Sequence, residues 1–257
     1  MHVARGRITE YNARELEALR KAGHLLDGIL HELGRLVGPG VSTAALDRAA
    51  RRLIEAAGAK PAFPEVRDYP ATLCTSINEE VVHGIPSEDR VLREGDLVSV
   101  DCGLSLGGFY ADKAITYPVG SVGDEAQRLL AATREALEAA IAHVREGAHL
   151  EDISAAIERT AAAYGFAVVR DYTGHGIGRR LHEEPQVPNR GTPGRGPKLR
   201  RGMVLALEPM VNAGTWQVET LADHWTVVTR DRALSAHFED TVAVTRDGPE
   251  VLTRGAS

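Results

Sequence analysis

The sequence predicts an α+β fold built from a duplicated unit, because two distant segments share one pattern and helices precede strands in both halves. LREGDLVSVD (residues 92–101) and LRRGMVLALE (residues 199–208) each lead through Leu, Arg and Gly into an apolar run that ends in a carboxylate. The same offset of 107 residues relates two pairs of glycines, Gly40 with Gly147 and Gly58 with Gly165. Such a repeat indicates a duplicated α/β unit. Helices followed by strands favour a layered α+β arrangement over an alternating parallel sheet.

Amphipathic helices are predicted in pairs, one pair in each half. Leucine and isoleucine recur at three-to-four spacing within residues 11–37, which is typical of a helix with one apolar face. Ser42 or Thr43 can cap the second helix. Residues 124–145 and 150–164 give the second pair.

The strands follow the helices in each half. Runs rich in β-branched and apolar residues predict strands at residues 72–78, 96–102, 108–117, 167–171, 203–211, 225–229 and 238–245. No linker or low-complexity segment separates the halves. We therefore expect one compact, pseudo-symmetric domain over residues 1–257, with internal halves of about 1–120 and 121–257.

Composition predicts a globular chain without a membrane anchor. The apolar share is 43% and the charged share 26%, and 30 basic against 36 acidic residues give a net charge of −6, which argues against a general nucleic-acid binder. No apolar run approaches the roughly 18 residues of a membrane span, and the N-terminus does not have the form of a signal peptide. Cys74 and Cys102 cannot make a disulfide framework and form no zinc motif, so we expect a cytoplasmic protein with reduced thiols.

Carboxylates occupy related places on the predicted strands. Asp101 and Glu208 end the two matching strands, and Asp112 and Glu239 follow in similar contexts. A buried carboxylate without a partner is costly, and neither lysine nor arginine recurs opposite these positions in the pattern. A metal centre accounts for them, with His175 as a nitrogen ligand. Four carboxylates suit two divalent ions better than one.

His175 lies in the stretch YTGHGIGRRLHEEPQVPN (residues 172–189), which contains three glycines in five residues and a second histidine, His182. We expect the glycines to let the backbone pass close to a metal and a substrate. Simpler interpretations exist for each residue alone. A single strand-end acid is usually solvated, His83 could be a core histidine, and His182 could belong to a surface loop. The coincidence of the four acids with the duplication favours a site.

Five motifs connect these residues to a known family: CTSINEEVVHGIP, VDCG, GHGIGRRLHEEPQVPN, GMVLALEPM and FEDTVAVT. With them the chain closely resembles the bacterial type I methionine aminopeptidases over nearly its whole length. The short distance from His182 to Glu208 leaves no room for the long insertion of the type II enzymes. The resemblance implies the pita-bread fold, a curved antiparallel sheet with outer helices. It also implies hydrolysis of the N-terminal methionine from nascent proteins and peptides, with a preference for a small second residue.

The resemblance further implies a dinuclear centre. Asp112 and Glu239 would bridge two divalent ions, which could be Co, Mn, Fe or Zn. Asp101 would hold one ion, and His175 and Glu208 the other. Such ions lower the pKa of a shared water, and the resulting hydroxide would attack the first peptide carbonyl.

Three residues would be catalytic by resemblance. Glu208 would take a proton from the water and pass it to the leaving amine. His182 would donate to the oxyanion, and His83 would orient the substrate near the scissile amide.

The implied methionine pocket departs from the family in part. Tyr69, Cys74 and Trp225 match its usual lining, although without the resemblance Cys74 and Trp225 would be interpreted as core residues. Phe63, Val66 and Leu181 stand where relatives often have Cys, Tyr and Phe.

Two residues beside the implied ligands also depart from the family. Lys113 stands after Asp112, where the family usually has Thr or Ser. It should point to the opposite face of its strand. His237 stands two residues before Glu239, where relatives often have Gln.

Two alternative functions stay open. A proline-specific peptidase would share the fold and the five ligands, although the HEEPQVPN run argues against it. A non-catalytic peptide-binding or ribosome-associated module would have lost ligands that this chain keeps. The resemblance implies a monomer that acts on N-terminal methionine peptides and nascent chains, with transient ribosome contact and no membrane or specific nucleic-acid partner.

Overall fold

Each half of the chain begins with a pair of helices in the computed structural model, which describes residues 7–255. The helices are α1 (Ala13–Leu36), α2 (Thr43–Ala56), α3 (Asp124–Ala142) and α4 (Leu150–Ala163). They confirm the predicted segments, with ends that differ by up to three residues. Ser42 caps α2, because its side chain accepts a hydrogen bond from the Ala45 amide. Asn12 and Glu15 form a capping box at the start of α1.

The rest of the described chain contains fifteen strands, which are joined by turns and loops. They are β1 (Lys60–Pro61), β2 (Leu73–Ile77), β3 (Glu80–Val82), β4 (Leu97–Leu106), β5 (Phe109–Pro118), β6 (Ala167–Val168), β7 (Thr173–Gly176), β8 (Glu183–Pro188), β9 (Val204–Leu207), β10 (Met210–Asn212), β11 (Val218–Thr220), β12 (Val227–Thr229), β13 (Ser235–His237), β14 (Asp240–Thr245) and β15 (Gly248–Val251). A short 3₁₀ turn, Phe63–Glu65, lies between β1 and β2.

The predicted strand over residues 203–211 is wrong in its extent. The chain leaves the ladder at Glu208 and Pro209, which separates β9 from β10. Proline has no N–H to donate, so a strand is readily interrupted there. The predicted strand 167–171 shrinks to β6, which has two residues. Several strands of two to six residues were not predicted, because they are too short or too rich in glycine and proline to show a clear alternation.

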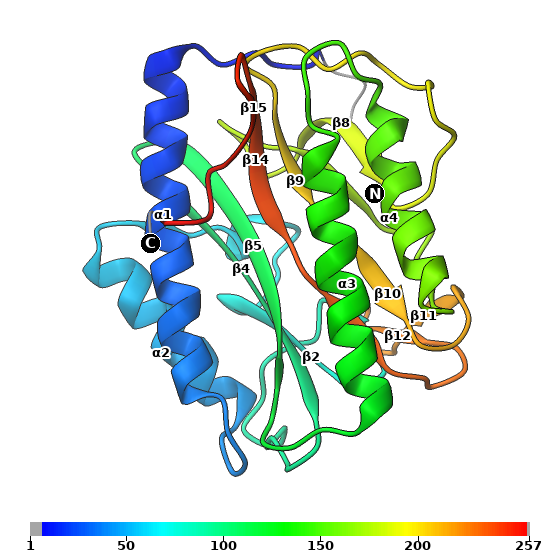
Figure 1. Ribbon diagram of the computed structural model, residues 1–257. Coiled ribbons are helices and arrows are strands. Elements are labelled where there is room, and N and C mark those ends of the chain that lie inside the picture. The colour runs from blue at the N-terminus through cyan, green and yellow to red at the C-terminus, as the bar shows by residue number, and fades with distance from the viewer. Residues whose placement is uncertain (1–6, 256–257) are drawn as a thin grey trace.

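All strand pairs among the described residues are antiparallel, as predicted for this fold class. β4 and β5 form a long hairpin in which Asp101 lies opposite Ala114. In the second half, β15, β14, β9, β7 and β8 form one sheet in that order. An isolated bridge between Ala114 and Glu239 joins β5 to the start of β14. Figure 1 shows these two strands side by side, between α1 and α3.

The duplication inferred from the sequence is visible in the backbone. Gly40 and Gly147 have φ angles of +89° and +85°, a region that favours glycine. Each donates its N–H to a leucine carbonyl, Leu92 in the first half and Leu199 in the second. Isolated bridges repeat at the same offset of 107 residues, joining Ser42 to Val91 and His149 to Lys198. The two halves therefore connect their second helix to their strands in the same way.

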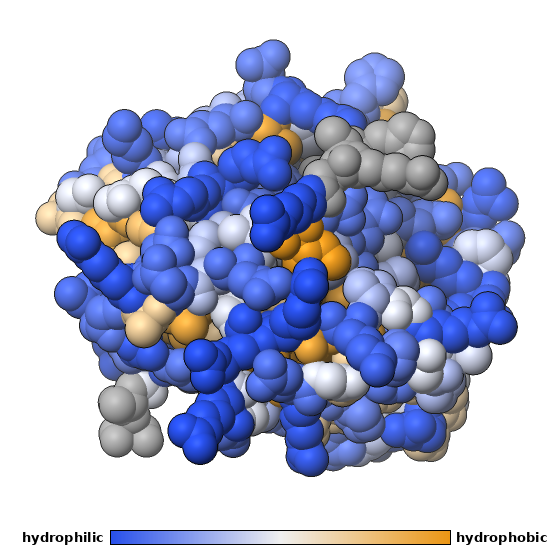
Figure 2. Space-filling view, turned by 90° about the horizontal axis from the view of Figure 1, so that it is seen from above, coloured by the Kyte–Doolittle hydropathy of each residue, from blue (hydrophilic) through white to orange (hydrophobic). Residues whose placement is uncertain are grey.

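The helices lie on one side of the strands, toward the viewer in Figure 1, and shield them from solvent. One apolar cluster joins α3 and α4 to β9 and β14, and another joins α1 and α2 to β2, β4 and β5. Hydrophilic residues cover most of the face in Figure 2. No helix in residues 7–255 is long and apolar enough to cross a membrane.

Candidate metal centre

Strands from both halves bring the five predicted ligands to one place. Asp101 lies on β4 and Asp112 on β5, whereas His175 lies on β7. Glu208 directly follows β9, and Glu239 directly precedes β14. Because β4 pairs with β5 and β7 pairs with β9, each half contributes a rigid pair of neighbouring positions. All five side chains line one cavity of about 230 Å³.

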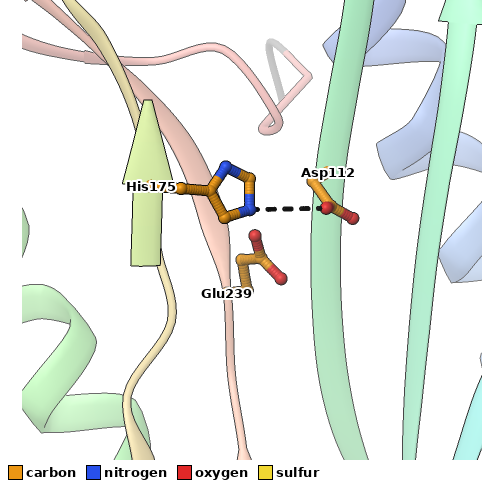
Figure 3. A group of neighbouring side chains, drawn as sticks. All are labelled: Asp112, His175 and Glu239. Atoms are coloured by element: carbon orange, nitrogen blue, oxygen red, sulfur yellow. Dashed lines mark ion pairs between the residues drawn. The ribbon is translucent and has the colours of Figure 1, made fainter. Parts of the chain in front are cut away.

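Three of these side chains form a cluster that could hold a metal ion. Ligand atoms of Asp112, His175 and Glu239 all lie within 4.8 Å of one another, and all three residues are buried. Figure 3 shows them pointing toward a common centre from three different strands or strand ends. His175 Nε2 lies 3.9 Å from Asp112 Oδ2 and 3.7 Å from Glu208 Oε1. These separations are too long for direct hydrogen bonds, as expected of groups arranged around an ion.

The carboxylates lack the partners that burial normally requires. Asp101 Oδ1, Asp112 Oδ1 and Glu239 Oε1 are buried without a hydrogen-bond partner. Burial raises the pKa of Asp101 to about 7, an effect that a hydrogen bond with Asp112 opposes. Burial, and secondarily the neighbouring acids, holds the pKa of Asp112, Glu208 and Glu239 well above the usual range. A divalent cation would satisfy the orphaned oxygens and reverse this cost, so the donor set fits a metal site.

His175 is oriented for ligation by its own backbone neighbourhood. Its Nδ1 lies 2.9 Å from the Gly176 carbonyl oxygen, which can only accept a hydrogen bond. The proton is therefore placed on Nδ1, and Nε2 faces the acids with its lone pair free. Burial lowers the pKa of His175 to about 4, which favours the neutral form that a metal requires.

Two further histidines stand at the rim of the cluster. The His182 ring centroid lies 4.5 Å from that of His175, and His83 makes edge contacts with Tyr172 and Trp225. Burial lowers the pKa of His83 to about 4 and that of His182 to about 3, so both are neutral near pH 7. Both line the same cavity, which excludes the interpretation of either as an isolated core or surface histidine.

The glycines around His175 allow close contacts within the protein, whereas a close approach to a metal and a substrate was expected. A Cβ at Gly174 would lie 2.4 Å from the Ala206 carbonyl oxygen, and one at Gly176 would lie 2.1 Å from that of Glu184. At Gly178 it would lie 2.0 Å from the Tyr11 hydroxyl. These glycines make room for neighbouring strands and for Tyr11, so the close approach is between parts of the protein.

A buried carboxylate fixes the loop that carries His182. Glu183 is 4% exposed and accepts hydrogen bonds from the Tyr11 hydroxyl at 2.9 and 3.0 Å. It also accepts from the Arg179 and Arg180 amides at 3.0 Å. Neither Tyr11 nor Glu183 was identified from the sequence, because nothing local relates two residues so far apart.

An apolar wall stands beside the cluster. Phe63, Val66, Tyr69, Cys74 and Trp225 line the cavity. The Tyr69 hydroxyl lies 3.0 Å from the carbonyl oxygens of both Leu73 and Gly84, and its ring meets Trp225 edge-on at 5.0 Å. These contacts hold the wall in a fixed shape.

One predicted residue does not line the cavity, and four residues that were not predicted do. Leu181 is buried in the same apolar cluster as Tyr69 but is not among the described residues that line the cavity. Arg67, Tyr172, Thr220 and His224 do line it and were not predicted. They lie in loops or strand ends without a recognisable motif. Cys74 and Cys102 are both buried and free.

The fold and this centre together define a class, a metal-dependent hydrolase whose site lies between two duplicated halves. Residues 17–246 match the metallopeptidase family M24, and the chain belongs to this family. It is 50% identical over 242 residues to the methionine aminopeptidase of Clostridium acetobutylicum, covering 94% of this chain and 97% of that protein. The crystal structure of the methionine aminopeptidase from Thermotoga maritima has a TM-score of 0.95 and 43% identity, covering 97% of this chain and 100% of that one. The pita-bread fold expected from the sequence is confirmed.

A more distant likeness shows the same fold. The prolidase from Pyrococcus horikoshii has a TM-score of 0.78 at 22% identity, and the match covers 96% of this chain but only 64% of the prolidase. That likeness shows a shared fold alone. The chain spans nearly the full length of the methionine aminopeptidases that it matches.

Proposed function

We propose that this chain is a methionine aminopeptidase that removes the N-terminal methionine of proteins and peptides whose second residue is small. The observation that carries the proposal is the buried group of Asp112, His175 and Glu239, with orphaned carboxylate oxygens, beside an apolar wall. A thioether side chain suits such a wall, because it is flexible and contacts aromatic rings favourably.

We further propose that the five predicted ligands hold two divalent ions, with Asp112 and Glu239 shared between them. Four carboxylates and an imidazole line the same cavity, which is more negative charge than one ion needs. When bound, such ions polarise a carbonyl oxygen and make water more acidic. Their identity among Co, Mn, Fe and Zn is left open by a donor set of oxygen and nitrogen without thiolate.

Three residues of the chain would handle protons and orientation. Glu208, which lines the cavity with its Oε1 3.7 Å from His175 Nε2, would accept a proton from the attacking water and deliver it to the leaving amine. His182 would donate a hydrogen bond to the scissile carbonyl oxygen as negative charge develops there. His83, held at the rim by Tyr172 and Trp225, would orient the scissile amide.

The substrate would be bound by its first residue. Its side chain would lie against Phe63, Tyr69, Cys74 and Trp225, with Leu181 behind them. Its α-amino group would lie on the Asp101 side, where a buried acid offers compensation for positive charge. Recognition of a free amine explains why only a terminal residue would be removed.

The proposal extends to the setting of the enzyme. We place it in the cytoplasm as a monomer, with one catalytic domain over residues 1–257 and transient contact with the ribosome. The full-length match to bacterial relatives and the two buried, free cysteines support the cytoplasmic part of this setting. Membrane and specific nucleic-acid partners are not part of the proposal.

A series of peptides Met-X-Ser, with X from Gly to Trp, tests the function at fixed metal and pH. Hydrophobic contacts in the first pocket discriminate by only about 1–3 kcal/mol per methylene, whereas steric overlap beside His83 and His182 cannot be relieved cheaply. We therefore expect kcat/KM to fall steeply once X is larger than Val. Comparable values for Ala and Leu would contradict this selectivity.

The same assay separates the alternatives. Faster cleavage of Ala-Pro peptides than of Met-Ala-Ser would indicate a proline-specific peptidase. Metal binding without any turnover would indicate a peptide-binding module.

A further inference from the structure

A buried group of charges lies directly behind the metal centre. Lys113 follows Asp112 and Asp240 follows Glu239, and successive residues of a strand face opposite sides. Lys113 Nζ lies 2.5 Å from Asp240 Oδ1 and 3.5 Å from Asp27 Oδ1. The side chains of Lys113 and Asp240 are only 7% and 2% exposed. Lys113 therefore points away from Asp112, as expected. Its partner is Asp240, the residue that follows Glu239, and Glu239 is the other carboxylate proposed to be shared between the ions.

The C-terminal segment closes this group. Arg254 binds Asp240 Oδ2 through both Nε and Nη2, at 2.9 and 2.7 Å. Thr253 donates to Asp240 Oδ1 at 2.8 Å, and the Gly255 amide donates to Asp27 Oδ2 at 2.9 Å. A single carboxylate, Asp240, thus receives a lysine from β5 and an arginine from the C-terminal segment. Its neighbour Asp27, on α1, accepts a hydrogen bond from the Gly255 amide at the end of the same segment.

Apolar packing is incomplete at this point. A cavity of about 450 Å³ lies beside Lys113 and Asp240 and is lined by residues of α1, α3, β5 and β14. The gap between these helices, through which both strands are visible in Figure 1, is crossed by the C-terminal segment. Directional ion pairs therefore have a larger part in fixing the strands here than they would in a packed core.

We propose that Lys113, Asp240 and Arg254 form a clamp that positions the carboxylates of Asp112 and Glu239 for metal binding. This inference rests on the proposed metal centre. The clamp residues touch neither substrate nor metal, and they act through the backbone of β5 and β14. Thr241 and Asp112 already join these strands by side-chain to backbone hydrogen bonds of 2.8 and 3.2 Å. The clamp adds the charge pairing that keeps the two ligands at a fixed separation.

Arg254→Met tests the clamp without opening the core, because this side chain is 40% exposed. Arg246→Met, an exposed arginine in the turn between β14 and β15, is the matched control. Mn²⁺ affinity of the metal-free protein is measured by titration calorimetry, together with backbone hydrogen exchange. We expect Arg254→Met to weaken Mn²⁺ binding about 10-fold, the lower end of what partners of metal ligands contribute. Exchange should accelerate in β5 and β14, and the control should leave both readouts unchanged.

Asp240→Asn provides a second test, since it keeps the shape of the side chain and removes its charge. It should weaken Mn²⁺ binding at least as much as Arg254→Met. If both variants unfold at lower temperature but bind Mn²⁺ as the wild type does, the residues are only structural and the clamp is refuted. Wild-type protein that binds no divalent ion would instead overturn the proposed metal centre, and the clamp with it.

Discussion

Replacing Tyr11 by Phe tests how the loop before β8 is held. The change removes one hydroxyl and leaves the ring, so it creates almost no cavity. Tyr11 is 5% exposed, and its hydroxyl lies within 3.0 Å of both Glu183 carboxylate oxygens. Burial raises the pKa of Tyr11 far above its usual range, so the hydroxyl remains a donor at any working pH.

The stability lost in Tyr11→Phe depends on the hydrogen bonds that Glu183 would keep. The amides of Arg179 and Arg180 still donate to one of its oxygens, so the buried charge is not left bare. The loss is therefore that of a hydrogen bond to a charged acceptor, about 1.5–3 kcal/mol. Because His182 precedes Glu183, a less fixed loop should also lower kcat several-fold with little change in KM.

Urea unfolding, followed by tryptophan fluorescence with a chelator present, measures the change in stability. The midpoint should fall without a change in slope, which indicates lost stability rather than a different unfolded state. Tyr164→Phe, at the C-cap of α4, removes a hydroxyl that is hydrogen-bonded to Glu135 near the surface and should change the free energy of unfolding by less than about 0.5 kcal/mol. If Tyr11→Phe is as small in effect as this control, the hydrogen bonds to Glu183 do not stabilise the loop.

Three further predictions concern the metal centre. Asp112→Ala should lower metal content and turnover together, and full activity in this variant would refute a shared ligand. His175→Ala should lose metal, whereas His182→Ala should keep it and lose kcat by about 10²–10³, as removal of an oxyanion donor does elsewhere; metal analysis beside kinetics separates the two. In metal-free protein, the raised pKa of Asp101, about 7, means that the folded chain holds a proton that the unfolded chain releases. For Asp101 this loss of stability occurs as pH rises from its ordinary pKa of about 4 to about 7, at up to about 1.4 kcal/mol per pH unit. The loss continues above pH 7 through Asp112, Glu208 and Glu239, whose pKa lies well above the usual range, and saturating Mn²⁺ should abolish it. The buried histidines do not contribute above about pH 6.5, because their lowered pKa leaves them neutral in the folded state and their ordinary pKa is about 6.5 in the unfolded state.

The sequence predicted the elements that are long enough to show a regular pattern of apolar residues. The four helices run for 14 to 24 residues, long enough for a 3.6-residue period to be recognised. The long strands β4 and β5 were predicted for a similar reason. Strands such as β3 and β7 have only three and four residues, too few for an alternation to be distinguished from a loop. Their existence depends on pairing with distant strands, which local propensity does not encode.

The proposed ligands could be predicted because acids that end apolar strands at positions related by the duplication are unusual, whereas their supports could not. Glu183 stands among polar residues, and from the sequence alone it would be interpreted as a solvated acid in a loop. Its burial depends on Tyr11, whose position 172 residues earlier gives no sign of the contact. Residues that support a site through a single long-range hydrogen bond are therefore the part of a site that sequence patterns reveal least.

The clamp behind the metal centre is an exception that the duplication could have revealed. Glu239 occupies in the second half the context that Asp112 occupies in the first, so Asp240 corresponds to Lys113. Strand alternation sends both of these following residues to the side opposite the ligands. Corresponding positions in two halves lie close together only near the axis that relates the halves, and the bridge between Ala114 and Glu239 shows that β5 and β14 meet there. Two like charges at these positions would have destabilised the junction, whereas an acid and a lysine compensate each other's buried charge. Lys113 and Asp240 carry opposite charges in this chain, so the two residues behind the proposed ligands neutralise each other beside this axis.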